Sequence, residues 1–179
     1  FQYDFQVMGG VYNSEDIVTG LGWAGNLLNA AFRGEASYFH PYQDFSDTSG
    51  SFVISLGGDY SFTNSLMLQT EILYNSASND DSDFNLTEFY NQSVNAKNLS
   101  VFEWTFFAGV SYPVTPLINV NLSGMYSPQD NFAFAGPSVS FSLDDNFMVD
   151  LNVQTFFSDI PKEEGGSGTY AFLRGKWSF

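Results

Sequence analysis

Residues 52–62 read FVISLGGDYSF, and apolar and small polar side chains alternate along this stretch. The even-numbered positions carry Phe, Ile, Leu and Tyr, with one Gly, whereas the odd-numbered positions are mostly Ser, Gly and Asp. Alternation with a period of two is typical of a β-strand whose two faces meet different surroundings. The stretch therefore predicts a strand with one apolar and one polar face.

The same alternation recurs along the whole chain, and no helical period of apolar residues accompanies it. Strands of soluble proteins most often have about 5 to 6 residues, whereas a tilted strand needs about 9 to 11 to cross a bilayer. The alternating segments of this chain have the length of strands that cross a bilayer. We expect ten strands, near residues 1–13, 16–26, 29–41, 51–63, 66–77, 101–113, 117–127, 132–143, 147–158 and 168–179.

The chemistry of the two faces favours a membrane over an aqueous exterior. The apolar faces are aromatic-rich and free of charge, and the opposite faces consist of Ser, Thr, Asn, Gln and Gly with sparse charges. In lipid, a sheet satisfies all its backbone hydrogen bonds only as a closed barrel. The sequence thus predicts one domain over residues 1–179, an all-β transmembrane antiparallel up-and-down barrel. The short and long connections alternate, as in bacterial outer-membrane barrels.

Composition excludes several other classes of protein. The chain has 179 residues with 20 Asp and Glu against 5 Lys and Arg, a net charge of −15, and its mean hydropathy is −0.11. So few bases disfavour nucleic-acid binding, which needs a basic surface for phosphates. The absence of cysteine removes disulfides and thiolate metal sites. No cofactor is expected.

The final ten residues, YAFLRGKWSF, place Trp177 and Phe179 on one face of the last predicted strand. This outward aromatic pair resembles the assembly signal of bacterial outer-membrane barrels. The resemblance implies recognition by the barrel insertion machinery. Gly175 lies one position later than the glycine of the common pattern, so Trp177 and Phe179 carry the match.

A broader resemblance covers most of the chain. The stretches GLGWAGN, FRGEASYFHP, VSYPVTPLINVNLSGMYSP, GPSVSFSL and FLRGKWSF resemble the C-terminal part of porin-like barrels from the Bacteroidetes group. The resemblance implies a location in the outer membrane, with lipid and lipopolysaccharide as surroundings. It leaves two alternatives: a complete barrel of ten strands, or the last strands of a larger one. It brings no catalytic residues.

The charged side chains on the predicted polar faces form the main candidate site. They are expected to face the barrel lumen: Asp4, Arg33, Glu35, Asp59, Glu71, Asp150, Arg174 and Lys176. One interpretation is a constriction that selects ions or small solutes. The other is a set of salt bridges that plugs a barrel too narrow to conduct, because eight strands leave little room beyond side chains.

Two other motifs are candidate sites. His40, near Asp44 and Ser46, suggests an outer-membrane hydrolase, but an aromatic-belt position among tyrosines is the simpler interpretation. The acidic run NDDSD at 79–83 suggests a Ca²⁺ site, with a solvated loop as the alternative. The sequence predicts neither a catalytic nor a metal site. We expect a porin-like channel for small solutes or ions, and the alternative is a plugged barrel with a structural, adhesive or partner-binding role.

Overall fold

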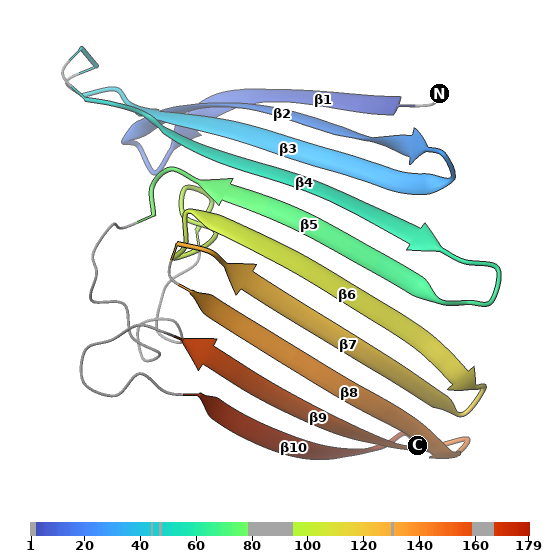
Figure 1. The fold of residues 1–179 in the computed structure, drawn as a ribbon. Helices are drawn as coiled ribbons and strands as arrows, with labels where there is room; N and C mark the ends of the chain where they lie inside the picture. Colours follow the sequence, from blue (N-terminus) through green and yellow to red (C-terminus); the bar gives the residue numbers. More distant parts are fainter. Residues whose placement is uncertain (1–2, 44, 47, 79–94, 130, 159–166) are drawn as a thin grey trace. The chain divides into compact units, whose positions relative to one another are not determined.

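Ten β-strands make up the regular structure of the computed structural model, which describes residues 3–43, 45–46, 48–78, 95–129, 131–158 and 167–179. They form one antiparallel up-and-down sheet in the order β1 to β10 (Figure 1). Among the described residues no pairing joins β1 to β10, so the sheet is not closed. The strands are β1(Tyr3–Tyr12), β2(Asp16–Leu27), β3(Ala30–Pro41), β4(Ser51–Ser61), β5(Met67–Asn75), β6(Trp104–Thr115), β7(Ile118–Ser127), β8(Phe132–Asp144), β9(Phe147–Ser158) and β10(Gly168–Trp177).

No described segment forms a helix with the length and apolar character needed to cross a membrane.

Tight turns explain why successive strands pair. Leu28 and Asn29 connect β2 to β3 with φ angles of 52° and 67°. Positive φ at both central residues matches the twist of a two-residue hairpin. Asn13 and Ser14, between β1 and β2, also have positive φ, at 50° and 59°. Asn tolerates this conformation better than most residues, whereas Leu carries a steric cost there.

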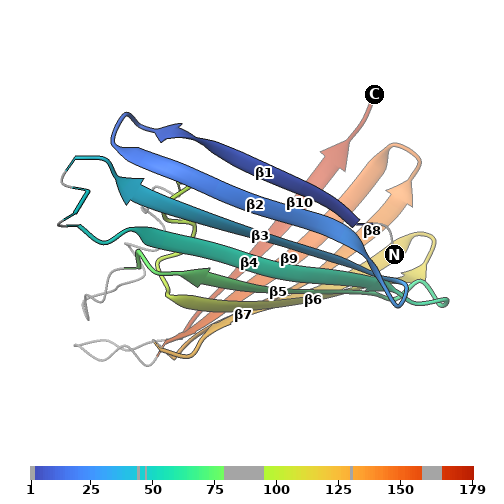
Figure 2. The same ribbon diagram turned by 90° about the horizontal axis from the view of Figure 1, so that it is seen from above.

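The first of two compact units comprises Phe1–Gly58 and Glu71–Thr105. In it β1, β2 and β3 lie side by side (Figures 1 and 2), and their register is continuous. Asp4 pairs with Ala24, which pairs with Arg33. Residues in one such row share a face of the sheet. Asp4 and Arg33 therefore lie on the same face, two strands apart.

The second unit comprises Asp59–Thr70 and Phe106–Phe179, and its register separates two kinds of row. An apolar row crosses five strands through Leu173, Leu151, Val139, Val120 and Tyr112. The adjacent row, on the opposite face, runs through Phe172, Asn152, Ser138, Asn121 and Ser111. The predicted alternation of faces is thus confirmed in this unit.

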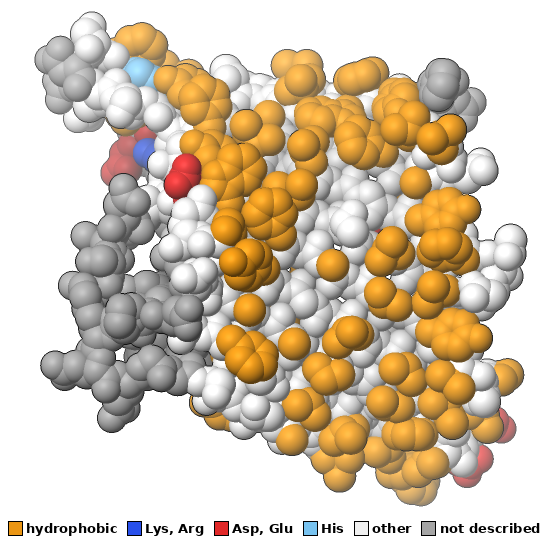
Figure 3. All heavy atoms as spheres, in the orientation of Figure 1, with side chains coloured by type: hydrophobic (Ala, Val, Ile, Leu, Met, Phe, Trp, Pro, Cys, Tyr) orange, Lys and Arg blue, Asp and Glu red, His pale blue; other side chains and the backbone are white. Residues whose placement is uncertain are grey.

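The apolar face of each unit is exposed. Val7 and Leu173 are 79% and 76% exposed. Figure 3 shows apolar side chains spread over the strands, with acidic groups near the strand ends. Apart from Asp144, at the β8–β9 turn, the charged residues of the described strands lie on the polar face: Asp4, Asp16, Arg33, Glu35, Asp59, Glu71, Asp150, Arg174 and Lys176.

The sixth strand begins later than the alternation predicts, at Trp104 instead of residue 101. Asn75, at the end of the neighbouring strand β5, contacts the preceding segment twice: its side chain donates to the carbonyl oxygen of Ser100 and its amide to that of Glu103, each at 2.8 Å. Phe102 is only 2% exposed. Residues 101–103 thus form bends beside the end of β5 instead of the regular strand that their alternation suggests.

Candidate functional site

An acidic hollow opens on the polar face of the first unit. It has a volume of about 730 Å³, and its charged lining residues are Asp4 on β1, Arg33 and Glu35 on β3, and Glu71 on β5. The intervening strand contributes Gly22 and Ala24, directly between the charged positions. Small residues there leave space above the sheet. Because three carboxylates meet one guanidinium, the hollow has a negative balance that favours cations.

A second hollow of about 410 Å³ adjoins the first and is mostly apolar. Glu35 and Ser55 line both hollows. Its walls include Tyr12 and Phe39, whose rings meet edge to face at 5.6 Å. The alternation predicts a polar lining on this face, so these apolar side chains depart from the pattern.

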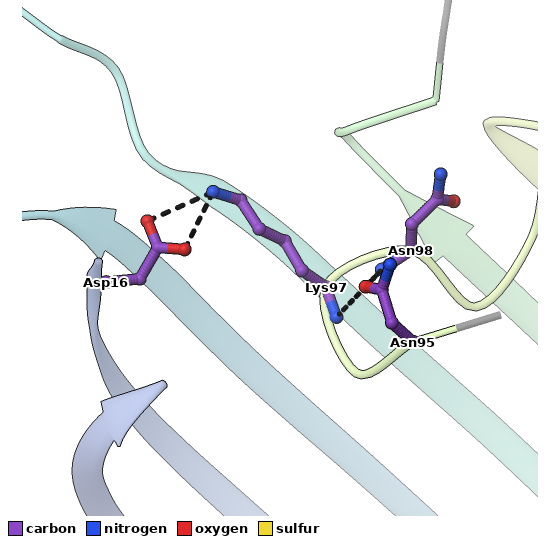
Figure 4. Close-up of polar contacts among 4 residues, drawn as sticks. All are labelled: Asp16, Asn95, Lys97 and Asn98. Atoms are coloured by element: carbon purple, nitrogen blue, oxygen red, sulfur yellow. Dashed lines mark hydrogen bonds and ion pairs between the residues drawn. The ribbon is translucent and has the colours of Figure 1, made fainter. Parts of the chain in front are cut away.

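A segment outside the strands closes one side of the apolar hollow. Ala96 and Leu99 line it, and between them Lys97 reaches Asp16 on β2. The Lys97 Nζ atom lies 3.0 Å and 2.9 Å from the two carboxylate oxygens of Asp16 (Figure 4). The Asp16 side chain is 6% exposed, and that of Lys97 is 33% exposed. A charge-assisted pair with a buried carboxylate therefore fixes this wall.

The same segment has a tight internal structure. The Oδ1 atom of Asn95 accepts hydrogen bonds from the backbone amides of Lys97 and Asn98, each at 3.0 Å (Figure 4). Asn75, at the end of β5, is fully buried and donates to Asn98 Oδ1 at 2.8 Å. Its own Oδ1 accepts from the amide of Ala77 at 3.0 Å. Asn75 thus ties the segment to a strand.

The second unit holds a separate ion pair on its polar face. Arg174 on β10 pairs in register with Asp150 on β9, and its Nε donates to Asp150 Oδ2 at 2.8 Å. The Asp150 side chain is 6% exposed and that of Arg174 is 70% exposed. Lys176 is two residues further along the same strand, opposite Met148.

The predicted cluster of eight residues is therefore divided between the two units. The structure brings Asp4, Arg33, Glu35 and Glu71 to one hollow, and Asp150 and Arg174 to one ion pair. Asp59 and Lys176 belong to the second unit. Sequence reasoning missed Asp16, Lys97 and Asn75 as partners. Lys97 lies in a segment without periodicity, so no pattern connects it to a strand 81 positions away.

The terminal pair has the expected exposure, but its role as an assembly signal stays a prediction. Trp177 is 70% exposed, and its ring centroid lies 5.8 Å from that of Phe147. After β10 ends, the amide of Ser178 still donates to the carbonyl oxygen of Asn146 at 2.9 Å. Phe179 is fully exposed.

The two minor candidates have different outcomes. Both ring nitrogens of His40 are engaged: Tyr38 Oη lies 2.8 Å from Nδ1, and the carbonyl oxygen of Phe45 lies 2.9 Å from Nε2. Because a carbonyl only accepts, Nε2 donates to Phe45, and in the neutral ring Nδ1 then accepts from the Tyr38 hydroxyl. Asp44 and residues 79–83 lie outside the described residues. Within the described part, no three His, Asp or Glu side chains are grouped to hold a metal ion.

No family model, curated protein or solved structure matches the chain.

Proposed function

We propose that the chain is a porin-like channel of a bacterial outer membrane, in which the ten strands belong to a transmembrane barrel that passes small solutes or ions. The carrying observation is the segregation of charge: Asp144 aside, every charged residue of the described strands lies on the polar face. Lys or Arg on the lipid face costs about 2–4 kcal/mol at the membrane midplane. A sheet with one charge-free face therefore suits lipid on that face and water on the other.

Membrane orientation is tested with two neighbouring residues of β9. Leu151 is on the apolar row and Asn152 on the polar row. We expect Leu151→Arg to reduce insertion into lipid vesicles strongly, at about 2–4 kcal/mol, and Asn152→Arg to insert nearly as the parent does. Equal insertion of the two variants would contradict the assignment of faces.

The acidic hollow supports passage of cations in preference to anions. A low-dielectric wall focuses the field of carboxylates into a water-filled space. In planar bilayers we expect cation-selective openings, with the cation preference reduced in the Glu35→Gln, Glu71→Gln double variant. Asp145→Asn, in the β8–β9 turn of the second unit, is the matched control. Unchanged selectivity in the double variant would reject this role for the hollow.

One observation favours the alternative, a plugged barrel with a structural, adhesive or partner-binding role. Lys97 and Asp16 fix a non-strand segment against the polar face, where it occupies space above the sheet. A parent protein that inserts but stays electrically silent would support this alternative over the channel.

The proposal extends to assembly by the barrel insertion machinery. Phe179 and Trp177 are exposed at the end of the last strand, where another protein can contact them. We expect Phe179→Asp to lower the amount of protein in cell membranes while refolding into detergent is less affected. Phe45→Asp, an exposed aromatic of the first unit, is the control substitution. Equal losses in cells and in refolding would argue against a recognition signal.

A further inference from the structure

The apolar hollow of the first unit departs from the small and polar lining that the alternation predicts for this face. Its strand-borne lining includes Met8, Val18, Phe39 and Val53, at positions where the alternation calls for small or polar side chains. Places where local pattern and global fold disagree are often functional. This hollow is therefore the strongest candidate for a binding site.

Charge at the hollow is confined to one end. Among the described residues that line the apolar hollow, Glu35 is the single ionisable acid or base apart from the phenol of Tyr12. Glu35 also lines the acidic hollow, where Asp4 and Glu71 add two carboxylates and Arg33 adds one guanidinium, so the balance there is negative. The joined space thus passes from an apolar chamber to a carboxylate edge within one compact unit.

We propose that the joined hollow binds a small molecule with an apolar body and a positively charged amine. The apolar body fills the chamber between Phe39, Val53 and Leu99, and the amine donates charge-assisted hydrogen bonds to the Glu35 carboxylate. The neighbouring rings of Tyr12 and Phe39 favour a cation over an anion, because an aromatic face is electron-rich. The chamber volume of about 410 Å³ lies within the range of about 300–1,000 Å³ that is usual for small-molecule pockets.

The Lys97–Asp16 pair is a positioning element of this site. Together with the bonds from Asn75, it holds Ala96 and Leu99 against the sheet, where they line the chamber. Lys97 itself contacts Asp16 and not Glu35, which leaves the Glu35 carboxylate at the edge for a ligand. The proposal does not depend on passage of solutes, because binding requires only the first unit's hollow.

Binding is tested with 4-phenylbutylamine on the full chain in nanodiscs, measured by calorimetry with empty nanodiscs subtracted. The neutral 4-phenylbutanol and the anionic 4-phenylbutyrate have the same apolar body. We expect saturable binding of the amine, at least about tenfold tighter than the alcohol, and no binding of the acid. Equal affinity for the amine and the alcohol, or no saturable binding of the amine, would overturn the proposal.

Two substitutions locate the site. Glu35→Gln keeps the side-chain shape, and we expect it to weaken the amine about tenfold without changing the alcohol. Glu15→Gln, in the exposed β1–β2 turn, is the matched control and should leave both affinities unchanged. Val18→Phe fills the chamber, so both affinities should fall. Far-UV circular dichroism confirms that each variant is folded. An unchanged amine affinity in folded Glu35→Gln would overturn the proposal that the Glu35 carboxylate binds the amine. A parent protein that is electrically silent but still binds the amine would contradict the proposed channel function and leave the binding site standing.

Discussion

Asp16–Lys97 in the first unit and Asp150–Arg174 in the second both join a nearly buried carboxylate to a more exposed base. Asp150 and Arg174 are opposite each other on neighbouring strands, so the register alone brings them together. Asp16 and Lys97 have no register in common, since Lys97 lies in a turn outside the strands. The Asp150–Arg174 pair adds a bond to a sheet already formed, whereas the Asp16–Lys97 pair determines where a separate segment lies.

The largest expected effect comes from breaking the pair that no register supports. Lys97→Met removes both hydrogen bonds to a carboxylate that is 6% exposed. We expect the free energy of unfolding to fall by about 1.5–3 kcal/mol, because bonds to charged groups are worth that much and the acid stays buried. Hydrogen exchange at the amides of residues 95–99 should also accelerate.

The control for Lys97→Met is a double variant that leaves no unpaired charge. Lys97→Met combined with Asp16→Leu removes the buried charge together with its partner. Replacing both partners by apolar groups is often close to neutral, so most of the lost stability should return. A double variant as unstable as Lys97→Met would show that the segment is held by other contacts.

This contrast explains what the sequence could and could not predict. The ten strands, their alternating faces and the Asp150–Arg174 neighbourhood follow from a period-two pattern and short turns, which are local properties. The gathering of Asp4 and Arg33 follows from the same register across β2. The wall formed by Leu99 and Lys97 depends on contacts over long sequence distances. No periodicity encodes such contacts.

The next test concerns a contact in the first unit that does follow the register. Gly34 pairs with Trp23, and the indole ring lies where a side chain at position 34 would begin. Gly34→Val forces the ring aside, and we expect a loss of about 1–3 kcal/mol in the free energy of unfolding. Gly10→Val is the matched control, because nothing lies within 4 Å of a Cβ at that position. Equal losses of stability in the two variants would mean that the replacement of a strand glycine, and not the displacement of the Trp23 ring, causes the effect.

A smaller effect is expected when the registered ion pair is broken. The Arg174 side chain is 70% exposed, and solvent screens much of its attraction to Asp150. Arg174→Gln should therefore lower the melting temperature less than Lys97→Met does, with little change in hydrogen exchange along β9. Exchanging the two residues, Asp150→Arg with Arg174→Asp, should recover the parent's melting temperature, since the register still places them opposite. A larger loss than in Lys97→Met would contradict the distinction between the two pairs.

The smallest effect is expected in the turn between β2 and β3, where backbone conformation and not side-chain packing determines the contribution of a residue. Leu28 has a φ of 52° and is 86% exposed, so its side chain pays a steric cost and packs little. Leu28→Gly removes that cost, and we expect a gain of about 0.5–1 kcal/mol, reduced by the greater freedom of glycine in the unfolded chain. Leu143→Gly in β8 is the matched control: Leu143 is 64% exposed without positive φ, and its loss should destabilise the protein. Chemical denaturation of both variants measures the difference. A loss of stability in Leu28→Gly would show that the Leu28 side chain contributes contacts outweighing its backbone strain.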